Sequence, residues 1–278
     1  MSRNTFLARA ALIVMVGFLL AKVAGIARQL AITYSFGTSG TMDAYFAAFT
    51  APDLIFTLIS GGALATAFIP IFSEYLNKEQ SDRATAWRMA SNVLTVSLGL
   101  SLSAAAVVAL FAPWIIGTVV APAFSPELKA LTVDLMRLIL ISTVIFSVSG
   151  LVTGVLHTLQ HFLLPALAPV LYNVGIIFGA LVLAPRLPES QQVYGLAWGS
   201  VVGALLHLGI QIPALVVHRA RLYPLFDLRD PGLRQVAILM APRAAALALI
   251  YAKFVVRSNF ASRLGEGSLS ALDYAWDL

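Results

Sequence analysis

The stretch LILISTVIFSVSGLVTGVLHTLQHFLLPALAPVLYNVGIIFGALVLAP, from Leu138 to Pro185, contains no formally charged residue. An α-helix rises about 1.5 Å per residue, so about 20 apolar residues cross the roughly 30 Å hydrocarbon layer of a membrane. The stretch is more than twice that length, and the polar segment HTLQH (His157 to His161) divides it. It therefore predicts two membrane-spanning helices joined by a tight turn.

The same criterion, applied outward in both directions, finds five further apolar stretches. They are Phe6–Tyr34, Asp43–Ile71, Met89–Ser125, Gln191–Val217 and Val236–Asn259. Pro113 and Pro122 place the helix end in the second half of Met89–Ser125, so this run is one span and a loop. An eighth stretch begins at about Ser268 and reaches Leu278 after about 16 Å of helix. The fold class is therefore all-α: a polytopic transmembrane helical bundle of seven complete spans plus the start of an eighth. We expect the chain to be a truncated piece of a longer protein.

Composition supports this fold class and excludes others. Hydrophobic residues make up 59% of the 278 residues and charged residues only 11%, against about 45–50% and 25% in soluble domains. These values exclude a water-soluble enzyme and a disordered chain. The absence of Cys excludes thiolate metal sites and Cys nucleophiles, and no GxxxxGK[ST] phosphate loop is present for ATP hydrolysis. We expect no enzymatic activity, no cofactor and no nucleic-acid partner.

The distribution of Lys and Arg predicts the orientation, because basic loops mark the cytoplasmic side. With the N-terminus inside, nine basic residues fall on the inner side: Arg3, Arg9, Lys78, Arg83, Arg88, Arg219, Arg221, Arg229 and Arg234. Four fall on the outer side: Lys129, Arg186, Arg257 and Arg263. The chain is therefore expected in the cell membrane as a multi-pass protein with a cytoplasmic N-terminus.

Charges inside spans are the candidate functional residues, since a centred Lys or Arg costs roughly 2.5–3.5 kcal/mol on insertion scales and normally faces a cavity or a partner. The candidates are Lys22, Arg28, Arg243 and Lys253. We expect Lys22, Arg28 and Arg243 to face a cavity, and Arg257, near the end of its span, to extend toward the headgroups. Four cations around one cavity would suit an anionic ligand such as a diphosphate.

The acids of the second span have two interpretations. Asp43 follows the turn at Gly37 and Gly40, and Asp53 follows Pro52, so either could cap a helix N-terminus as readily as serve function. A drug-cation exporter would use such carboxylates. Ser60, Gly61 and Gly62, followed by Pro70, mark a break in this span.

A metal site has little support in the sequence. His157 and His161 are spaced i, i+4 and could ligate a metal, but they lie in a turn where polar residues are expected. We therefore expect no metal site.

Four segments carry a family resemblance: AKVAGIARQL (Ala21–Leu30), MDAYFAAFTAPDLIFTLISGGALATAFIPIFSEY (Met42–Tyr75), GVLHTLQHFLLPALAPVLYN (Gly154–Asn173) and GLAWGSVVGALLHLGIQIPAL (Gly195–Leu215). They resemble MurJ/MviN-type lipid II flippases of the multidrug/oligosaccharidyl-lipid/polysaccharide exporter superfamily. The resemblance implies fourteen helices in two lobes around a cavity that opens alternately to each side. Residues 1–230 would form the N-terminal lobe, helices 1–6 with the cytoplasmic 6–7 loop, and residues 231–278 the start of the second lobe.

The resemblance also implies site residues. Lys22 and Arg28 match basic positions of the family's first helix, and Asp43 matches an acid. Four positions depart from the family pattern: Phe56 and Asp277 replace basic residues, Gln29 replaces an acid and Gly61 replaces a glutamate. The predicted substrate-binding residues are therefore Lys22, Arg28 and Asp43, with Arg243 and Lys253 replacing the lost charge.

The implied function is to move a polyprenyl-diphosphate-linked peptidoglycan precursor, lipid II, from the inner to the outer leaflet by alternating access, in support of cell-wall biogenesis and cell shape. The membrane potential favours outward movement of negative charge by about 2.3 kcal/mol per charge per 100 mV. The expected partners are this anionic lipid-linked precursor, membrane lipids and cell-wall synthesis proteins. The alternatives are a related polysaccharide-lipid or drug exporter, or a non-transporting scaffold for cell-wall synthesis.

Overall fold

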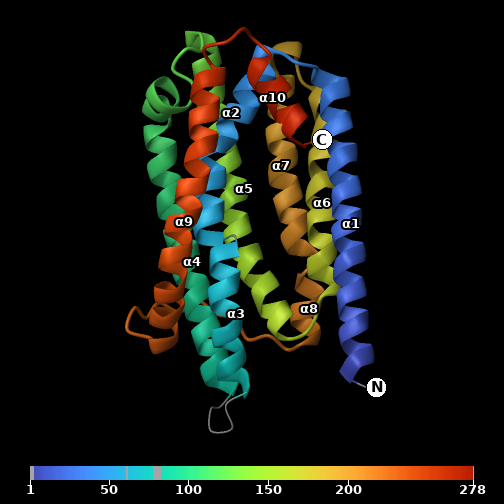
Figure 1. The fold of residues 1–278 in the computed structure, drawn as a ribbon, viewed down its shortest axis with the longest axis vertical. Helices are drawn as coiled ribbons and strands as arrows, with labels where there is room; N and C mark the ends of the chain where they lie inside the picture. Colours follow the sequence, from blue (N-terminus) through green and yellow to red (C-terminus); the bar gives the residue numbers. More distant parts are fainter. Residues whose placement is uncertain (1–2, 61, 78–82, 278) are drawn as a thin grey trace.

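The computed structural model describes residues 3–60, 62–77 and 83–277, and within these ranges the chain is an all-helical bundle without strands (Figure 1). The helices are α1 (Arg3–Phe36), α2 (Gly40–Ile55), α3 (Gly62–Asn77), α4 (Arg83–Trp114), α5 (Pro126–Thr158), α6 (Leu163–Phe178), α7 (Gln192–Gly209), α8 (Ile212–Val217), α9 (Pro231–Ala261) and α10 (Ser268–Asp277). Lys78 and Gly61 lie outside the described residues, as do the side chains of Arg3, Arg9 and Asp277.

The seven predicted spans are confirmed within the described ranges. The membrane-length apolar helices are Ala11–Phe36, Gly40–Asn77, Arg83–Val120, Pro126–Thr158, Leu163–Arg186, Glu189–Val217 and Pro231–Ala261. The long helices stand roughly parallel, the N-terminus lies at one end of the bundle, and α10 lies across the other end (Figure 1). The expected start of an eighth helix at Ser268 is also confirmed.

The third span ends in the second half of the uncharged run Met89–Ser125, as expected. Its helix, α4, continues through Pro113 into a π-helical stretch, Ile115–Val120. A proline inside a helix leaves the carbonyl four residues earlier without its N–H donor. Here that carbonyl belongs to Ala109, and Arg137 of α5 donates its Nε–H to it at 3.1 Å. A side chain from the neighbouring helix thus replaces the missing hydrogen bond, and the helix continues.

The absence of charge predicts that the fourth span begins at Leu138. In the structure, its helix begins earlier, at Pro126. Ser125 caps this helix by accepting a hydrogen bond from the Leu128 N–H, and Pro126 occupies the first turn, where its missing N–H costs nothing. Asp134 and Arg137, both half-exposed, pair at 3.8 Å one turn apart. Charged residues therefore extend the helix beyond its apolar segment.

Two capping expectations for the second span are wrong. Ser39, not Asp43, caps α2, since its side chain accepts from the Met42 N–H. Asp53 caps no restarted helix, because α2 runs through Pro52 to Ile55. The expected break instead takes the form of a π-helical stretch, Phe56–Ser60, between α2 and α3.

Glycines bring α6 and α7 into backbone contact. A Cβ added to Gly175 of α6 would collide with the Gly203 Cα of α7, and one added to Gly179 would lie 2.5 Å from the Gly195 carbonyl oxygen. A Cβ added to Gly199 would be equally crowded, at 2.8 Å from the Gly179 Cα. No side chain fits at these positions, so small residues set the close packing of the two helices. We call these five glycines the α6–α7 seam.

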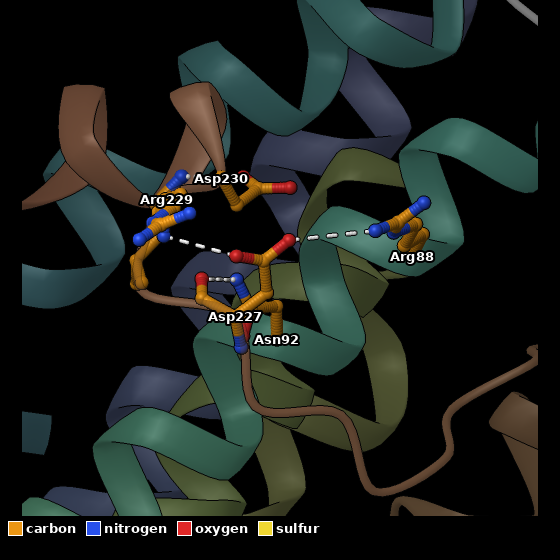
Figure 2. Close-up of polar contacts among 6 residues, drawn as sticks. Arg88, Asn92, Asp227, Arg229 and Asp230 are labelled. Carbon is orange, nitrogen blue, oxygen red and sulfur yellow. Dashed lines mark hydrogen bonds and ion pairs between the residues drawn. The ribbon is translucent and has the colours of Figure 1, made fainter.

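The segment between α8 and α9 has no helix or strand and lies along α4, and we call residues 219–230 the strap. Asn92 of α4 is fully buried and pairs with the backbone of Asp227 in both directions, at 2.7 Å and 2.9 Å. Arg88 forms an ion pair with the Asp227 carboxylate at 3.4 Å (Figure 2). Asp230 then caps α9 by accepting from the Leu233 N–H.

Two further side chains of α4 hold the strap upstream of Asp227. Ser91 accepts a hydrogen bond from the Tyr223 N–H at 3.2 Å, and Thr95 accepts one from the Leu225 N–H at 3.0 Å. Ser91, Asn92 and Thr95 share one helical face. Their side chains pair with backbone groups of the strap that have no partner in a helix or sheet. The strap is therefore fixed to α4 before α9 begins.

Candidate functional site

A cavity of about 270 Å³ lies between α1, α2, α6, α9 and α10. These elements meet in the half of the bundle next to α10 (Figure 1). Its wall combines charged, polar and aromatic side chains: Arg28, Gln29, Tyr45, Phe46, Phe49, Asp53, Tyr172, Tyr251, Phe254, Arg257, Ser258, Asp273 and Trp276. A cavity of this kind offers ring faces for an apolar or sugar moiety and charged groups for a polar one.

The charges on the cavity wall are balanced. Arg257 of α9 forms an ion pair with Asp273 of α10, and both side chains are largely buried. Arg28 of α1 acts electrostatically on Asp53 of α2, on the same wall. Among the described residues of the wall, two arginines therefore face two aspartates.

Two polar side chains on the wall have no described partner. Gln29 is 5% exposed and Ser258 is 3% exposed. Within the described ranges, neither the amide atoms of Gln29 nor the hydroxyl of Ser258 has a hydrogen-bond partner. Buried polar groups are nearly always paired, so these two groups indicate a ligand or water in the cavity.

Asp43 fixes the start of α10, the helix that forms one wall of the cavity. Its carboxylate is 3% exposed and accepts hydrogen bonds from the Gly267 and Ser270 backbone N–H groups, both at 2.7 Å. These N–H groups open α10, where a carboxylate also interacts favourably with the helix dipole. The Tyr274 hydroxyl of α10 also donates a hydrogen bond to the Gly37 carbonyl oxygen, at 2.8 Å. We call the contacts of Asp43 with Gly267 and Ser270 the latch.

The predicted site residues are not all brought together. Arg28 lines the cavity, whereas Lys22 and Arg243 do not line it. Lys253 is exposed, with its Nζ 4.8 Å from the Phe254 ring centroid and 5.1 Å from that of Trp276, so it lies beside the cavity wall. Asp43 serves the latch outside the wall.

For three wall residues, the sequence predicts another role or gives no prediction. Arg257 is expected to extend toward the headgroups, but it lies on the wall because Asp273 provides a partner. The sequence leaves open whether Asp53 caps a helix or serves function. Asp273 is not among the predicted site residues. An acid inside an apolar helix is itself a functional signal, and that signal could identify both.

Phe56, at the position where the resemblance implies a basic residue, lies against another aromatic side chain. Phe56 packs edge-on against Phe146 with ring centroids 5.4 Å apart. An aromatic contact therefore stands where the resemblance implies a basic residue.

The histidines at the opposite end of the bundle form no metal cluster. Among the described residues, no group of three or more His, Cys, Asp or Glu is close enough to hold a metal ion. His161 contacts His218 instead, with its Nδ1 3.5 Å from the partner Nε2. Partial burial and the neighbouring imidazole lower the pKa of His161 from its ordinary value.

Comparison with known proteins identifies the family. A family model described as "Lipid II flippase MurJ" matches residues 32–278. The chain belongs to the MurJ family. The lipid II flippase MurJ of Burkholderia cenocepacia is 36% identical over 272 residues, covering 95% of this chain and 52% of the relative. The chain therefore spans about half the length of the curated relatives it matches.

Solved structures support the fold assignment. A structure titled as lipid II flippase MurJ in an inward closed conformation matches 96% of this chain and 54% of its own, with a TM-score of 0.73 at 21% identity. The MATE multidrug transporter DinF-BH matches 99% of this chain and 60% of its own, with a TM-score of 0.70 at 16% identity. At these identities, the likeness concerns the MurJ and MATE fold alone.

Proposed function

We propose that this chain is part of a lipid II flippase, which moves the diphosphate-linked precursor from the inner to the outer leaflet by alternating access. The observation that carries the proposal is the cavity, in which Arg28 and Arg257 lie with Gln29 and Ser258, whose side chains have no hydrogen-bond partner in the described part of the chain. Arginines and neutral donors suit a diphosphate, because charge-assisted hydrogen bonds strengthen where water is scarce. The name of the matched family supports this ligand.

The two aspartates have a role in this proposal. A carrier must return empty, and a buried cation without a partner is costly in a closed cavity. Asp53 and Asp273 would neutralise Arg28 and Arg257 in the empty state, and the arginines would exchange these carboxylates for the diphosphate when substrate enters. The cavity could then close both with and without its ligand.

The remaining predicted residues take secondary roles. We assign the first contacts with diphosphate to Arg28 and Arg257, while Lys22, Lys253 and Arg243 lie outside the wall as second contacts along the route of entry. Asp43 tunes the site indirectly, since the latch holds α10 over the cavity. In the two-lobe arrangement, residues 1–230 form the first lobe and residues 231–278 begin the second.

One observation favours a second candidate, the export of a cationic drug. Asp53 and Asp273 lie among the aromatic rings of the wall, and carboxylates with aromatic faces are suited to organic cations. The choice between the two substrates is therefore open to direct test with the same purified protein.

The complete gene that encodes this chain should restore growth to bacteria depleted of their lipid II flippase. The purified protein should move labelled lipid II across vesicle membranes, because the cavity donors suit its diphosphate. Efflux of a cationic dye without lipid II movement would favour the drug exporter instead. Growth without either transport activity would favour the scaffold.

We further propose that the N-terminus and the strap are cytoplasmic, on the asymmetry of basic residues. The chain has no Cys, so single cysteines can be introduced without background. In intact cells, a membrane-impermeant maleimide should label Ala123→Cys, in the turn before α5, and should leave Leu228→Cys in the strap unlabelled. Permeabilised cells provide the control, in which both react. Labelling of only Leu228→Cys in intact cells would reverse the orientation.

A further inference from the structure

A second and larger cleft, of about 670 Å³, lies at the end of the bundle away from α10. It forms where α3, α5 and α8 end and α4 begins. Among the described residues, the charged ones on its wall are all arginines: Arg83 of α4, with Arg219 and Arg221 of the strap. Ser73, Asn77, Thr158, Gln160 and His218 add polar groups.

Among the described residues, the three arginines have no acidic partner. All three have exposed side chains, and none forms an ion pair with a carboxylate within the described ranges. Arg88, in contrast, lies on the same side of the molecule and is paired with Asp227. Positive residues on a cytoplasmic surface are common, but here three guanidinium groups converge on one cleft, which favours an anion.

The backbone of the cleft supplies an independent observation. Gln160 and Arg219 are the only non-glycine residues of the described chain with positive φ, at 57° and 51°, and both line the cleft. Each follows the end of a helix, α5 or α8, where glycine is the usual residue for this conformation. A non-glycine residue accepts strain there. The side chains of Gln160 and Arg219 both lie on the wall of the cleft.

The strap fixes one of the arginines in place. Ser91 of α4 donates to the Arg221 carbonyl at 3.4 Å and accepts from the Tyr223 N–H at 3.2 Å. The backbone that carries Arg221 is therefore held at the cleft, so less conformational entropy is lost when a ligand binds.

We propose that this cleft binds the phosphate group of an anionic ligand, with the headgroup of an anionic membrane lipid as its source. The helix ends that form the cleft place it at the membrane surface, where such headgroups lie. Basic pockets between helix ends on the cytoplasmic side bind lipid phosphates through the same contacts. The site is separate from the central cavity and does not depend on which substrate is transported.

The test measures binding of phosphatidylglycerol to the purified protein by native mass spectrometry, with phosphatidylcholine as the zwitterionic reference, whose headgroup has no net charge. The test variant combines Arg219→Gly and Arg221→Gln. Glycine suits the left-handed conformation at position 219, so this variant should melt at the same temperature as the parent or higher. The control combines Arg186→Gln and Arg263→Gln, which remove two charges at the opposite end of the bundle.

The test variant should bind phosphatidylglycerol about 25-fold more weakly, since each arginine near an anionic headgroup accounts for about fivefold. The control should bind as the parent does. A parallel titration with inorganic phosphate identifies the source: a rise in melting temperature in the parent alone would assign the cleft to soluble phosphate. Equal binding of both probes by the test variant and the control would overturn the proposal.

Discussion

Arg28→Ala in the complete protein should reduce lipid II transport by about 100-fold or more. Removing one partner of a buried charge contact costs about 2–5 kcal/mol, and here the loss would also leave Asp53 with a weaker counter-charge in the cavity. Expression and membrane insertion should persist, because removal of a charge eases insertion. Transport of labelled lipid II in vesicles, normalised to inserted protein, measures the effect.

Two companion variants sharpen this result. Arg28→Lys should keep part of the activity, because a point charge remains while the planar fork of donors is lost. Lys22→Ala should have a smaller effect, since Lys22 lies on the same helix but outside the cavity wall. Near-normal transport by Arg28→Ala, or equal behaviour of the Ala and Lys variants, would contradict a role for Arg28 in diphosphate binding.

Gly203→Leu should prevent the bundle from folding. A Cβ at this position would lie 2.5 Å from the Tyr172 carbonyl oxygen, and backbone atoms on the facing helix cannot rotate away. Overpacking in a core commonly costs about 1–3 kcal/mol, and a clash with backbone along the α6–α7 seam should exceed that range. We expect no monodisperse protein after detergent extraction, as measured by size-exclusion chromatography.

Gly99→Leu is the matched control, because Gly99 lies within α4 and a Cβ there meets nothing within 4 Å. Replacing a helical glycine should be neutral or stabilising by about 0.5–1 kcal/mol. A shift in elution or a lower melting temperature for both variants would mean that larger side chains, and not the seam, cause the defect.

The features that depend on local composition can be predicted from the sequence. The length of predominantly apolar sequence identifies all seven spans, since the membrane thickness sets the number of apolar residues needed. Helix ends are less accurate, because they depend on distant partners. The continuation of α4 through Pro113 needs Arg137 from the next helix, and no local pattern contains that contact.

The same limit explains the candidate site. Arg28 stands out because a cation inside a span is a strong signal by itself. The position of Arg257 on the cavity wall depends on Asp273, which reaches it from another helix. Asp43 is recognisable as an unusual acid, but its bonds to Gly267 and Ser270 join residues more than 220 positions apart. Charge alone indicates where function lies, and tertiary contacts determine which charges meet.

The latch has a consequence for how this protein can evolve. Asp43 holds α10 through main-chain N–H groups, and every residue except proline provides one. Gly267 is restricted by its own backbone, at a φ of 85°, and Ser270 by its complete burial and its hydrogen bond to the Gly267 carbonyl at 3.0 Å, but neither bond to Asp43 requires a particular side chain. Asp43 itself has no such freedom. In a strain that has lost Asp43, no change of a partner side chain can restore these hydrogen bonds. Revertants selected from such a strain should therefore carry mutations mainly at codon 43.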